Sequence, residues 1–346
     1  MKTIIPLNLS EGKTVPIVTG LTADELAEYI PSPGTVIAIV DKQVEGWFGR
    51  YFEGVPYSTM VADESLKTLD TIERLTVGLL ESGADRDTFL LGVGGGLVCD
   101  VTGFLAATYM RGIPFGFVPT TLLAQVDAAL GGKNGVNVHG YKNMLGTFTQ
   151  PEFLLCCTDA LATLNDRLYR AGMAEVIKIA LAADASLFTF IEQHAEALAA
   201  RRDDVLNEII RRAVSLKIAI VERDEKEKGE RRKLNLGHTV GHAIERTADD
   251  ILHGEAVSIG LACAARFSHR QGWLAAGDCE RITALLQYFH LPTTCAIPAA
   301  DLHDAILRDK KKSGVLLHYI ALSEIGKAVE TAVDIMNYEL QIICAL

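Results

Sequence analysis

The stretch at residues 92–100, GVGGGLVCD, is the feature that most restricts how this chain folds. It follows an apolar run at 88–91 and precedes a segment at 101–110 with the composition of a helix. We therefore predict a strand, a glycine-rich turn and a helix in succession. At such a junction, backbone N–H groups can face an anion and missing side chains let a diphosphate come close. A tight turn without a ligand explains the glycines equally, and their spacing differs from the common GxGxxG fingerprint.

The first part of the chain has the rhythm of a parallel α/β sheet. Short β-rich runs at 35–40, 89–91 and 115–118 alternate with helical or glycine-rich segments. Asp41 follows the first of these runs, where a carboxylate can accept hydrogen bonds from ribose hydroxyls. A helix N-cap or an ordinary loop acid is the alternative for this residue.

The second part of the chain has a helical pattern. After Pro151 we expect long helices over 203–222 and 255–272. Composition and length therefore predict an α/β domain over residues 1–150 and a helical domain over residues 151–346.

The charge and the cysteines exclude several classes of partner. With 33 Lys and Arg against 44 Asp and Glu, the formal net charge is −11, which argues against nucleic acid and anionic membranes. Seven cysteines without a CxxC pair indicate a reduced, cytoplasmic protein rather than a disulfide framework. We also find no run that approaches the length of a membrane span. A small anionic ligand remains compatible with these features, because an acidic protein can hold a local basic pocket.

A histidine cluster in the second part indicates a metal site. His238 and His242 lie four residues apart and share a helix face, and His253 follows after a short excursion. Glu175 supplies a carboxylate on an apolar helix, with Lys178 one turn later on the same face. Imidazole and carboxylate ligands that leave open positions are typical of catalytic zinc. The alternative for Glu175 and Lys178 is a surface ion pair.

Basic and polar residues gather at turn-like places along the chain. Each by itself is an ordinary solvated charge, but together with a metal and a dinucleotide site they indicate a polyanionic substrate. They include Arg111, Lys133, Lys142, Asn143, Arg231 and Lys310.

Seven segments occur in the order found in 3-dehydroquinate synthases: GVGGGLVCDVTGF, ATYMRG, PTTLLAQVDAALGGKNGVN, YKNMLG, AEVIK, LNLGHTVGH and LHGEAV. The chain resembles this family of sugar-phosphate cyclases from about Asp41 to Lys327. The resemblance implies a Rossmann-like α/β domain followed by an all-helical domain, with bound NAD, a divalent metal (zinc, or else cobalt) and a homodimer. It also implies conversion of 3-deoxy-D-arabino-heptulosonate 7-phosphate to 3-dehydroquinate and phosphate, a lyase reaction of the shikimate pathway that serves chorismate and aromatic amino-acid biosynthesis.

The resemblance also implies roles for individual residues. Those placed on NAD are Asp41, Glu64, Lys67, Gly95, Gly96, Asp100, Thr120, Thr121, Asp127, Lys133 and Lys142. Those that match metal ligands are Glu175, His238 and His253. Those at the substrate are Asp127, Lys133, Lys142, Asn143, Lys178, Lys217, Arg231, Asn235, His242 and Lys310, with Arg111 reaching the phosphate across a dimer. Cys99 departs from the family pattern, since many members have glycine there.

The implied reaction is chemically coherent. Metal coordination acidifies a substrate hydroxyl and eases hydride transfer to NAD, and the resulting ketone makes the adjacent proton acidic enough for phosphate elimination. Hydride return, ring opening and an intramolecular aldol step then complete the carbocycle. Either His242 or the leaving phosphate can carry the protons.

Three alternatives stay open on the sequence. Another sugar-phosphate cyclase, such as a 2-deoxy-scyllo-inosose or 2-epi-5-epi-valiolone synthase, would keep the NAD and metal motifs but change the substrate contacts. A metal-dependent polyol dehydrogenase would need exchangeable NAD and would lack the lysine cluster. A structural zinc site in a binding module would call for four protein ligands, often cysteines, and no cysteine lies near the three histidines.

Overall fold

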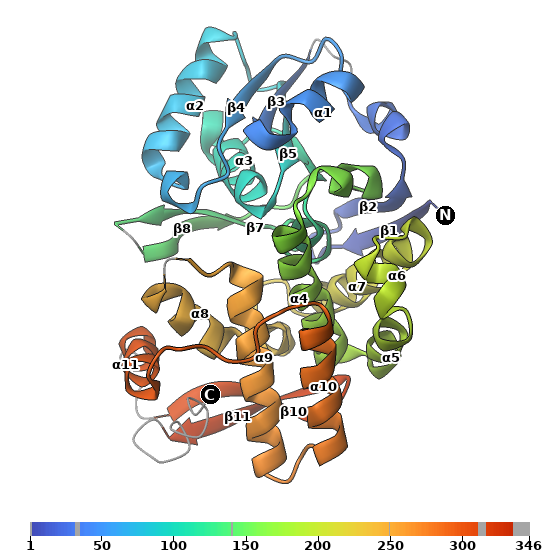
Figure 1. The fold of residues 1–346 in the computed structure, drawn as a ribbon. Coiled ribbons are helices and arrows are strands. Elements are labelled where there is room, and N and C mark those ends of the chain that lie inside the picture. Colours follow the sequence, from blue (N-terminus) through green and yellow to red (C-terminus); the bar gives the residue numbers. More distant parts are fainter. Residues whose placement is uncertain (1, 32–34, 140, 249, 311–315, 335–346) are drawn as a thin grey trace. The chain divides into compact units, whose positions relative to one another are not determined.

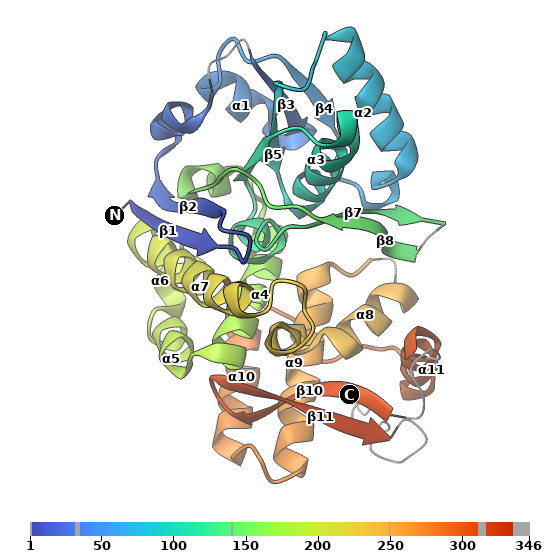
Figure 2. The ribbon, with the colours of Figure 1, turned by 180° about the vertical axis from the view of Figure 1, so that it is seen from behind.

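The computed structural model describes residues 2–31, 35–139, 141–248, 250–310 and 316–334 (Figures 1 and 2). The chain divides into two compact units. The first holds Met1–Asn165 together with Lys217–Lys226, and the second holds Asp166–Leu216 together with Glu227–Leu346.

The first unit is an α/β fold. Its strands are β1 (Thr3–Asn8), β2 (Thr14–Leu21), β3 (Val36–Asp41), β4 (Tyr57–Met60), β5 (Phe89–Gly94), β6 (Phe115–Pro119), β7 (Lys133–Val138), β8 (Tyr141–Phe148) and β9 (Leu154–Cys157). Its α-helices are α1 (Glu45–Tyr51), α2 (Leu69–Glu81) and α3 (Gly96–Thr108). Its shorter helical segments are η1 (Ala23–Tyr29), η3 (Lys42–Val44), η4 (Glu64–Leu66), η5 (Tyr109–Arg111), η6 (Ala124–Ala128) and η7 (Thr158–Thr163).

The main sheet of this unit reverses its strand order between β3 and β5. The seven strands lie in the order β1-β2-β9-β6-β5-β3-β4, with β1 and β2 antiparallel and the other neighbours parallel. The chain runs from β3 to β4 on one side, then returns to β5 on the other side of β3. In open parallel sheets, ligands bind outside the carboxyl ends of the strands at such a reversal. The predicted parallel α/β sheet is thus confirmed.

The two strands that flank this reversal, β3 and β5, are largely apolar. Every residue of β3 and of β5 is buried, as expected for parallel strands covered on both faces. By contrast α2 is amphipathic and buries only one stripe, which includes Ile72, Leu75 and Leu79.

The glycine stretch forms the predicted strand, turn and helix. Strand β5 ends at Gly94, Gly95 is the N-cap, and α3 begins at Gly96. No side chain caps the start of α3. Backbone N–H groups of the first helical turn are left without intrahelical partners at such a start, so this end of α3 suits an anion.

The second unit is mainly helical. Its α-helices are α4 (Asp166–Ala183), α5 (Ala185–Gln193), α6 (Ala195–Ala199), α7 (Asp203–Arg223, of which the part from Lys217 groups with the first unit), α8 (His238–Thr247), α9 (His253–Arg270), α10 (Ala276–Tyr288) and α11 (Ala299–Lys310). A 3-10 segment, η8 (Glu230–Asn235), precedes α8. The long helices expected near 203–222 and 255–272 are present as α7 and α9. No helix within the described residues has the length and apolar character needed to cross a membrane.

One antiparallel pair of strands corrects the expectation of an all-helical second part. Strands β10 (Leu316–Glu324) and β11 (Lys327–Asp334) form a hairpin closed at Gly326, whose φ is +88°. The hairpin packs on α9, where the Ser268 hydroxyl accepts a hydrogen bond of 2.8 Å from the Leu322 N–H. Tyr319 meets Phe267 edge to face at 5.1 Å. The helical pattern of the sequence did not reveal that a β-hairpin packs on α9.

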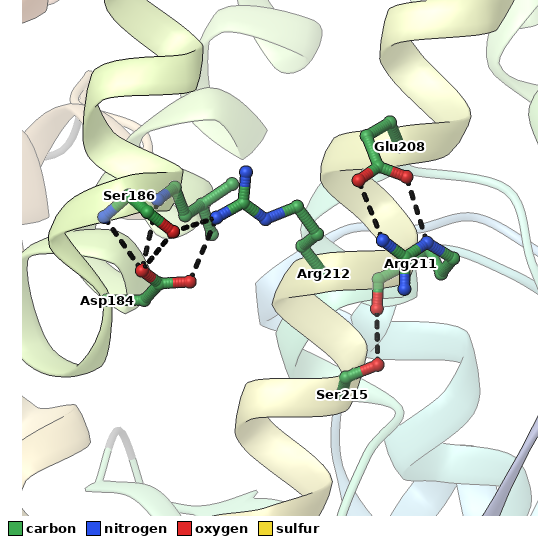
Figure 3. A network of polar contacts seen from close by, with 7 residues as sticks. Asp184, Ser186, Glu208, Arg211, Arg212 and Ser215 are labelled. Carbon is green, nitrogen blue, oxygen red and sulfur yellow. Dashed lines mark hydrogen bonds and ion pairs between the residues drawn. The ribbon is translucent and has the colours of Figure 1, made fainter.

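A polar network joins α5 to α7 (Figure 3). Asp184 caps α5 by accepting hydrogen bonds from the N–H groups of Ser186 and Leu187. The Arg212 guanidinium on α7 reaches the Asp184 carboxylate at 3.0 Å and the Ser186 hydroxyl at 2.5 Å. The adjacent Arg211 forms a bidentate pair with Glu208, one turn earlier on the same helix. A single carboxylate thus serves as a helix cap and as the link between two helices.

Glycines allow α8 and α9 to approach closely. A Cβ atom built on Gly260 of α9 would lie 1.9 Å from the carbonyl oxygen of Gly237, the N-cap of α8. Gly237 itself has φ +79°, a conformation that favours glycine. One turn along α8, a Cβ on Gly241 would lie 3.2 Å from the Ala256 carbonyl oxygen. The position of α8 against α9 therefore depends on missing side chains.

We predict that Gly260→Ala destabilises the protein by about 3 kcal/mol, because backbone atoms must move to admit the methyl group. Gly78→Ala is the matched control: Gly78 lies inside α2, and its added Cβ would meet only the Ser58 hydroxyl, at 3.7 Å. That control should stabilise the protein by about 0.5–1 kcal/mol through helix propensity. Urea denaturation measures both, and equal effects would refute the importance of the close approach.

Candidate functional site

The predicted site residues fall into two sets, one in each unit. The first unit holds Asp41, Glu64, Lys67, Gly95, Gly96, Asp100, Arg111, Thr120, Thr121, Asp127, Lys133, Lys142, Asn143 and Lys217. The second unit holds Glu175, Lys178, Arg231, Asn235, His238, His242, His253 and Lys310.

Carboxyl ends of neighbouring strands carry the core of the first set. Asp41 is the last residue of β3, and Val40 pairs with Val93 of β5, just before the glycine turn. The buried Asp41 carboxylate accepts a hydrogen bond of 3.0 Å from the Gln43 N–H and so caps η3. The N-cap alternative raised from the sequence is therefore real, and it leaves the second carboxylate oxygen without a capping bond. Burial raises the pKa of Asp41, and the Gln43 N–H opposes that shift.

The buried Lys67 is the centre of a polar cluster. Its Nζ lies 2.5 Å from Asp100 Oδ2 and donates to Asn143 Oδ1 at 2.6 Å. These residues come from the segment after η4, from α3 and from β8, so the fold brings together three distant parts of the sequence. Burial raises the pKa of Asp100 to about 6, although the Lys67 ammonium lowers it.

Asn137 belongs to the same cluster but was missed by the sequence reasoning. Its N–H donates to the Lys67 carbonyl oxygen at 2.7 Å, and its side chain bridges Glu64 Oε1 at 2.8 Å and the Asn143 N–H at 2.8 Å. Asn143 has φ +55°, a conformation that asparagine tolerates better than most residues. The available signal was the position of Asn137 inside the recognised segment GGKNGVN.

Thr120 and Thr121 follow β6, the neighbour of β5. The Thr120 N–H donates to the Gly94 carbonyl oxygen at 2.9 Å, and Thr121 Oγ1 accepts from the Ala124 N–H at 3.2 Å. A Cβ on Gly95 would lie 3.0 Å from Thr121 Cγ2. A Cβ on Gly96 would lie 2.8 Å from the Cβ atom of Ala128 in η6. Side chains at Gly95 and Gly96 would therefore crowd neighbouring residues of the same unit, so the packing of the turn requires these glycines.

Asp127 and Lys217 form the second ion pair of this set. The Lys217 Nζ donates to both the carboxylate and the carbonyl oxygen of Asp127, and the lysine side chain is 6% exposed. Lys133 begins β7 and Lys142 lies in β8, and both are exposed. Arg111 is also exposed and has φ +71°, an uncommon backbone conformation for arginine.

The second set is built around the carboxylate of Glu175. Donor atoms of Glu175, His238 and His253 all lie within 4.8 Å of one another. They come from α4, α8 and α9, which pack together in the second unit (Figure 1). Glu175 is fully buried, and no described residue gives either of its oxygens a hydrogen bond of regular geometry. A buried carboxylate and two imidazole rings suit a divalent transition metal.

Lys178 lies beside this carboxylate. Its Nζ is 2.5 Å from Glu175 Oε2, with the side chains 2% and 0% exposed. The surface ion pair considered from the sequence is therefore wrong, because both partners lie inside the helical unit. A pair of this kind matters mainly through the cost of removing one partner, which leaves a buried charge uncompensated.

Both candidate histidine ligands present Nε2 to the carboxylate. His253 Nε2 lies 3.2 Å and His238 Nε2 lies 3.9 Å from Glu175 Oε1. His238 Nδ1 contacts the Leu236 carbonyl oxygen at 3.2 Å, and His253 Nδ1 contacts Glu245 Oε2 at 3.2 Å. Burial disfavours the charged His253 ring, but the Glu175 and Glu245 carboxylates prevail and raise its pKa to about 10.

The remaining predicted residues of the second unit lie on α8, η8 and α11. His242 is exposed on α8, with its ring centroid 5.1 Å from that of His238. Arg231 is buried in η8, and Asn235 Nδ2 donates to Glu227 Oε1 at 2.6 Å. Lys310 is the last residue of α11, and its side chain lies outside the described part of the structure.

Comparisons with known proteins agree with the predicted resemblance. Residues 57–171 match the family description 3-dehydroquinate synthase N-terminal, and residues 172–312 match 3-dehydroquinate synthase C-terminal. A 3-dehydroquinate synthase of Halorhodospira halophila is 46% identical over 276 residues, which cover 79% of this chain and 78% of that protein.

Two solved structures share the fold along nearly the whole chain. One is the 2-epi-5-epi-valiolone synthase of Streptomyces hygroscopicus subsp. jinggangensis with NAD+ and Zn2+ bound, with TM-score 0.85, 29% identity, and 95% of this chain and 94% of that chain covered. The other is a 2-deoxy-scyllo-inosose synthase with carbaglucose-6-phosphate, NAD+ and Co2+, with TM-score 0.88, 26% identity and 99% of both chains covered.

We predict that Lys178→Met lowers the free energy of unfolding by about 3–5 kcal/mol, because it leaves the buried Glu175 charge without its cation. Lys327→Met is the control, since it breaks an equally spaced pair with Glu324 whose side chains are 64% and 65% exposed. That loss should stay below about 1 kcal/mol. Urea denaturation of chelator-treated protein tests both, and similar losses would contradict the buried-charge argument.

Proposed function

This chain belongs to the 3-dehydroquinate synthase family, and we propose that it converts 3-deoxy-D-arabino-heptulosonate 7-phosphate to 3-dehydroquinate and phosphate. The observation that carries the proposal is the cluster of Glu175, His238 and His253, which joins a buried carboxylate without regular hydrogen bonds to two imidazole rings. The chemistry makes the protein a carbon–oxygen lyase of the shikimate pathway.

The two units have different roles in this proposal. The first unit binds NAD at the carboxyl ends of β3, β5 and β6, with the uncapped start of α3 toward the diphosphate and Asp41 toward a ribose. The second unit binds the metal, zinc or cobalt, through Glu175, His238 and His253. When bound, NAD supplies a reversible hydride acceptor and the metal supplies a Lewis acid for substrate oxygens.

The substrate is a small anionic sugar phosphate, and cationic side chains bind it. We assign Arg231 and Lys310 to its anionic groups, and Lys133, Lys142 and Asn143 to further contacts with it. Lys178, beside the metal ligand Glu175, and Lys217, beside Asp127, orient substrate oxygens, with Asn235 contributing a further polar contact. His242 is exposed on α8 and exchanges protons with the substrate.

Assembly and location complete the proposal. The protein forms a homodimer in which Arg111, exposed and in a left-handed backbone conformation, reaches the phosphate of the other subunit. It works in the cytoplasm, in keeping with its six described cysteines, which are free thiols.

A related cyclase is the main competing function. The two structural neighbours act in that class, but their identity to this chain is 29% and 26%, whereas the Halorhodospira halophila synthase reaches 46%. Cationic partners such as Arg231 also suit a substrate that carries a carboxylate as well as a phosphate.

The proposal predicts that NAD is not consumed. Phosphate should appear one for one with a carbocyclic product when the heptulosonate phosphate is supplied with NAD and zinc. The absorbance of reduced cofactor should stay flat over many turnovers, because hydride returns before the product leaves. Accumulation of stoichiometric NADH without phosphate release would favour a polyol dehydrogenase instead.

Arg231 provides a test of the substrate contacts. Arg231→Met should cost about 2–5 kcal/mol in kcat/KM, because a substrate anion loses its partner in a desolvated site. The neighbouring Arg232→Met is the control, since Arg232 is 43% exposed and pairs with Glu330 at the surface. NAD affinity should be unchanged in both variants. Equal weakening of substrate and cofactor by Arg231→Met would assign that residue to the fold.

A further inference from the structure

We propose that Glu245 positions His253 for metal binding by accepting the Nδ1–H of its imidazole ring. The inference rests on the proposed metal site and extends it to a residue outside the recognised motifs. Glu245 does not bind the metal; it acts through the histidine.

Helix α8 places Glu245 on the face that carries the histidines. His238, His242 and Glu245 stand at positions i, i+4 and i+7 of α8, so their side chains project from one side of the helix. His253 is the first residue of α9 and therefore meets this face from the neighbouring helix. The close approach of the two helices at Gly241 and Gly260 sets the distance that the Glu245 side chain must span.

The two nitrogens of the His253 ring face two different carboxylates. Nδ1 lies 3.2 Å from Glu245 Oε2, and Nε2 lies 3.2 Å from Glu175 Oε1. A neutral imidazole carries one proton, so a proton on Nδ1 donated to Glu245 leaves the Nε2 lone pair directed at the Glu175 side. That tautomer and ring orientation are what a metal ligand at Nε2 requires.

His238, the other histidine ligand, is held in the same manner, but its acceptor is a backbone carbonyl oxygen, which is weaker than a carboxylate. His238 Nδ1 faces the Leu236 carbonyl oxygen at 3.2 Å, and its Nε2 also faces Glu175. A carboxylate acceptor raises the basicity of the ring more than a neutral carbonyl does. Glu245 therefore both orients His253 and strengthens it as a ligand.

A second arrangement of the same residues is geometrically available. Donor atoms of His242, Glu245 and His253 also lie within 4.8 Å of one another. An ion bound there would take His253 through Nδ1 and would leave out the fully buried Glu175 carboxylate, which faces the Nε2 atoms of both His253 and His238. It would also rest on His242, which is exposed. The burial of Glu175 thus favours the ion on the Nε2 side and the positioning role for Glu245.

Zinc affinity, measured by competition with a chromophoric chelator, tests the inference without relying on turnover. Glu245→Ala should bind zinc about 10- to 100-fold more weakly than the wild type, the usual effect of losing a residue that orients a ligand. Glu245→Gln should fall between the two, because its amide oxygen can still accept the Nδ1–H. In both variants one Co2+ should still bind at saturation, with a shifted visible absorption spectrum.

Glu192→Ala is the matched control. Glu192 also joins two helices of the second unit, through Arg281 at 2.6 Å, and its side chain is 25% exposed. Its loss should reduce stability without changing zinc affinity or the cobalt spectrum. Glu175→Gln is the ligand control and should bind zinc more weakly than either Glu245 variant.

The outcomes separate failure of this inference from failure of the metal site. Wild-type affinity and spectrum in Glu245→Ala would overturn the inference alone. Complete loss of zinc in Glu245→Ala with retention in Glu175→Gln would make Glu245 a direct ligand and overturn it as well. A wild-type protein that binds no zinc would refute the proposed metal site, and the inference with it. If Glu245→Ala does not fold, the near-isosteric Glu245→Gln decides by the same two readouts.

Discussion

The helical unit depends on how it accommodates one fully buried carboxylate. Glu175 sits in an apolar stretch of α4, where an isolated charge would be costly. Lys178 on the same helix supplies one compensating charge, and the rings of His238 and His253 approach from α8 and α9. This grouping of a carboxylate with two imidazole rings is the chemical reason to place a metal ion there.

Backbone proximity makes that arrangement possible. Gly237, Gly241 and Gly260 let α8 and α9 come close enough for side chains of both helices to meet one carboxylate. The same proximity carries Glu245 to the far side of the His253 ring. Packing and chemistry are therefore coupled in this unit, since a methyl group added between the helices would displace the donor atoms as well as the backbone.

The α/β unit brings polar groups together at the carboxyl ends of its inner strands. The reversal of strand order brings the end of β3 beside the glycine turn after β5. The buried Lys67 then pairs with Asp100 and donates a hydrogen bond to Asn143, and so links α3 to β8. The side chains of Lys67, Asp100 and Asn143 thus hold one another in place.

The sequence by itself determined the alternation of the first part, the helix of the second and the strand–glycine–helix junction, because these rest on local periodicity and on recognisable motifs. It also predicted which residues belong to both sets. Only the tertiary structure decided that Glu175 and Lys178 are buried and that Asp41 caps η3. It also decided that strands β10 and β11 pair on α9. Finally, it added Asn137 to the first set of site residues and Glu245 to the second. These facts depend on which distant segments pack together. Such contacts produce no periodic pattern in the sequence. The i, i+4, i+7 spacing of His238, His242 and Glu245 is an exception, because it places the three side chains on one face of a helix and can be read from the sequence.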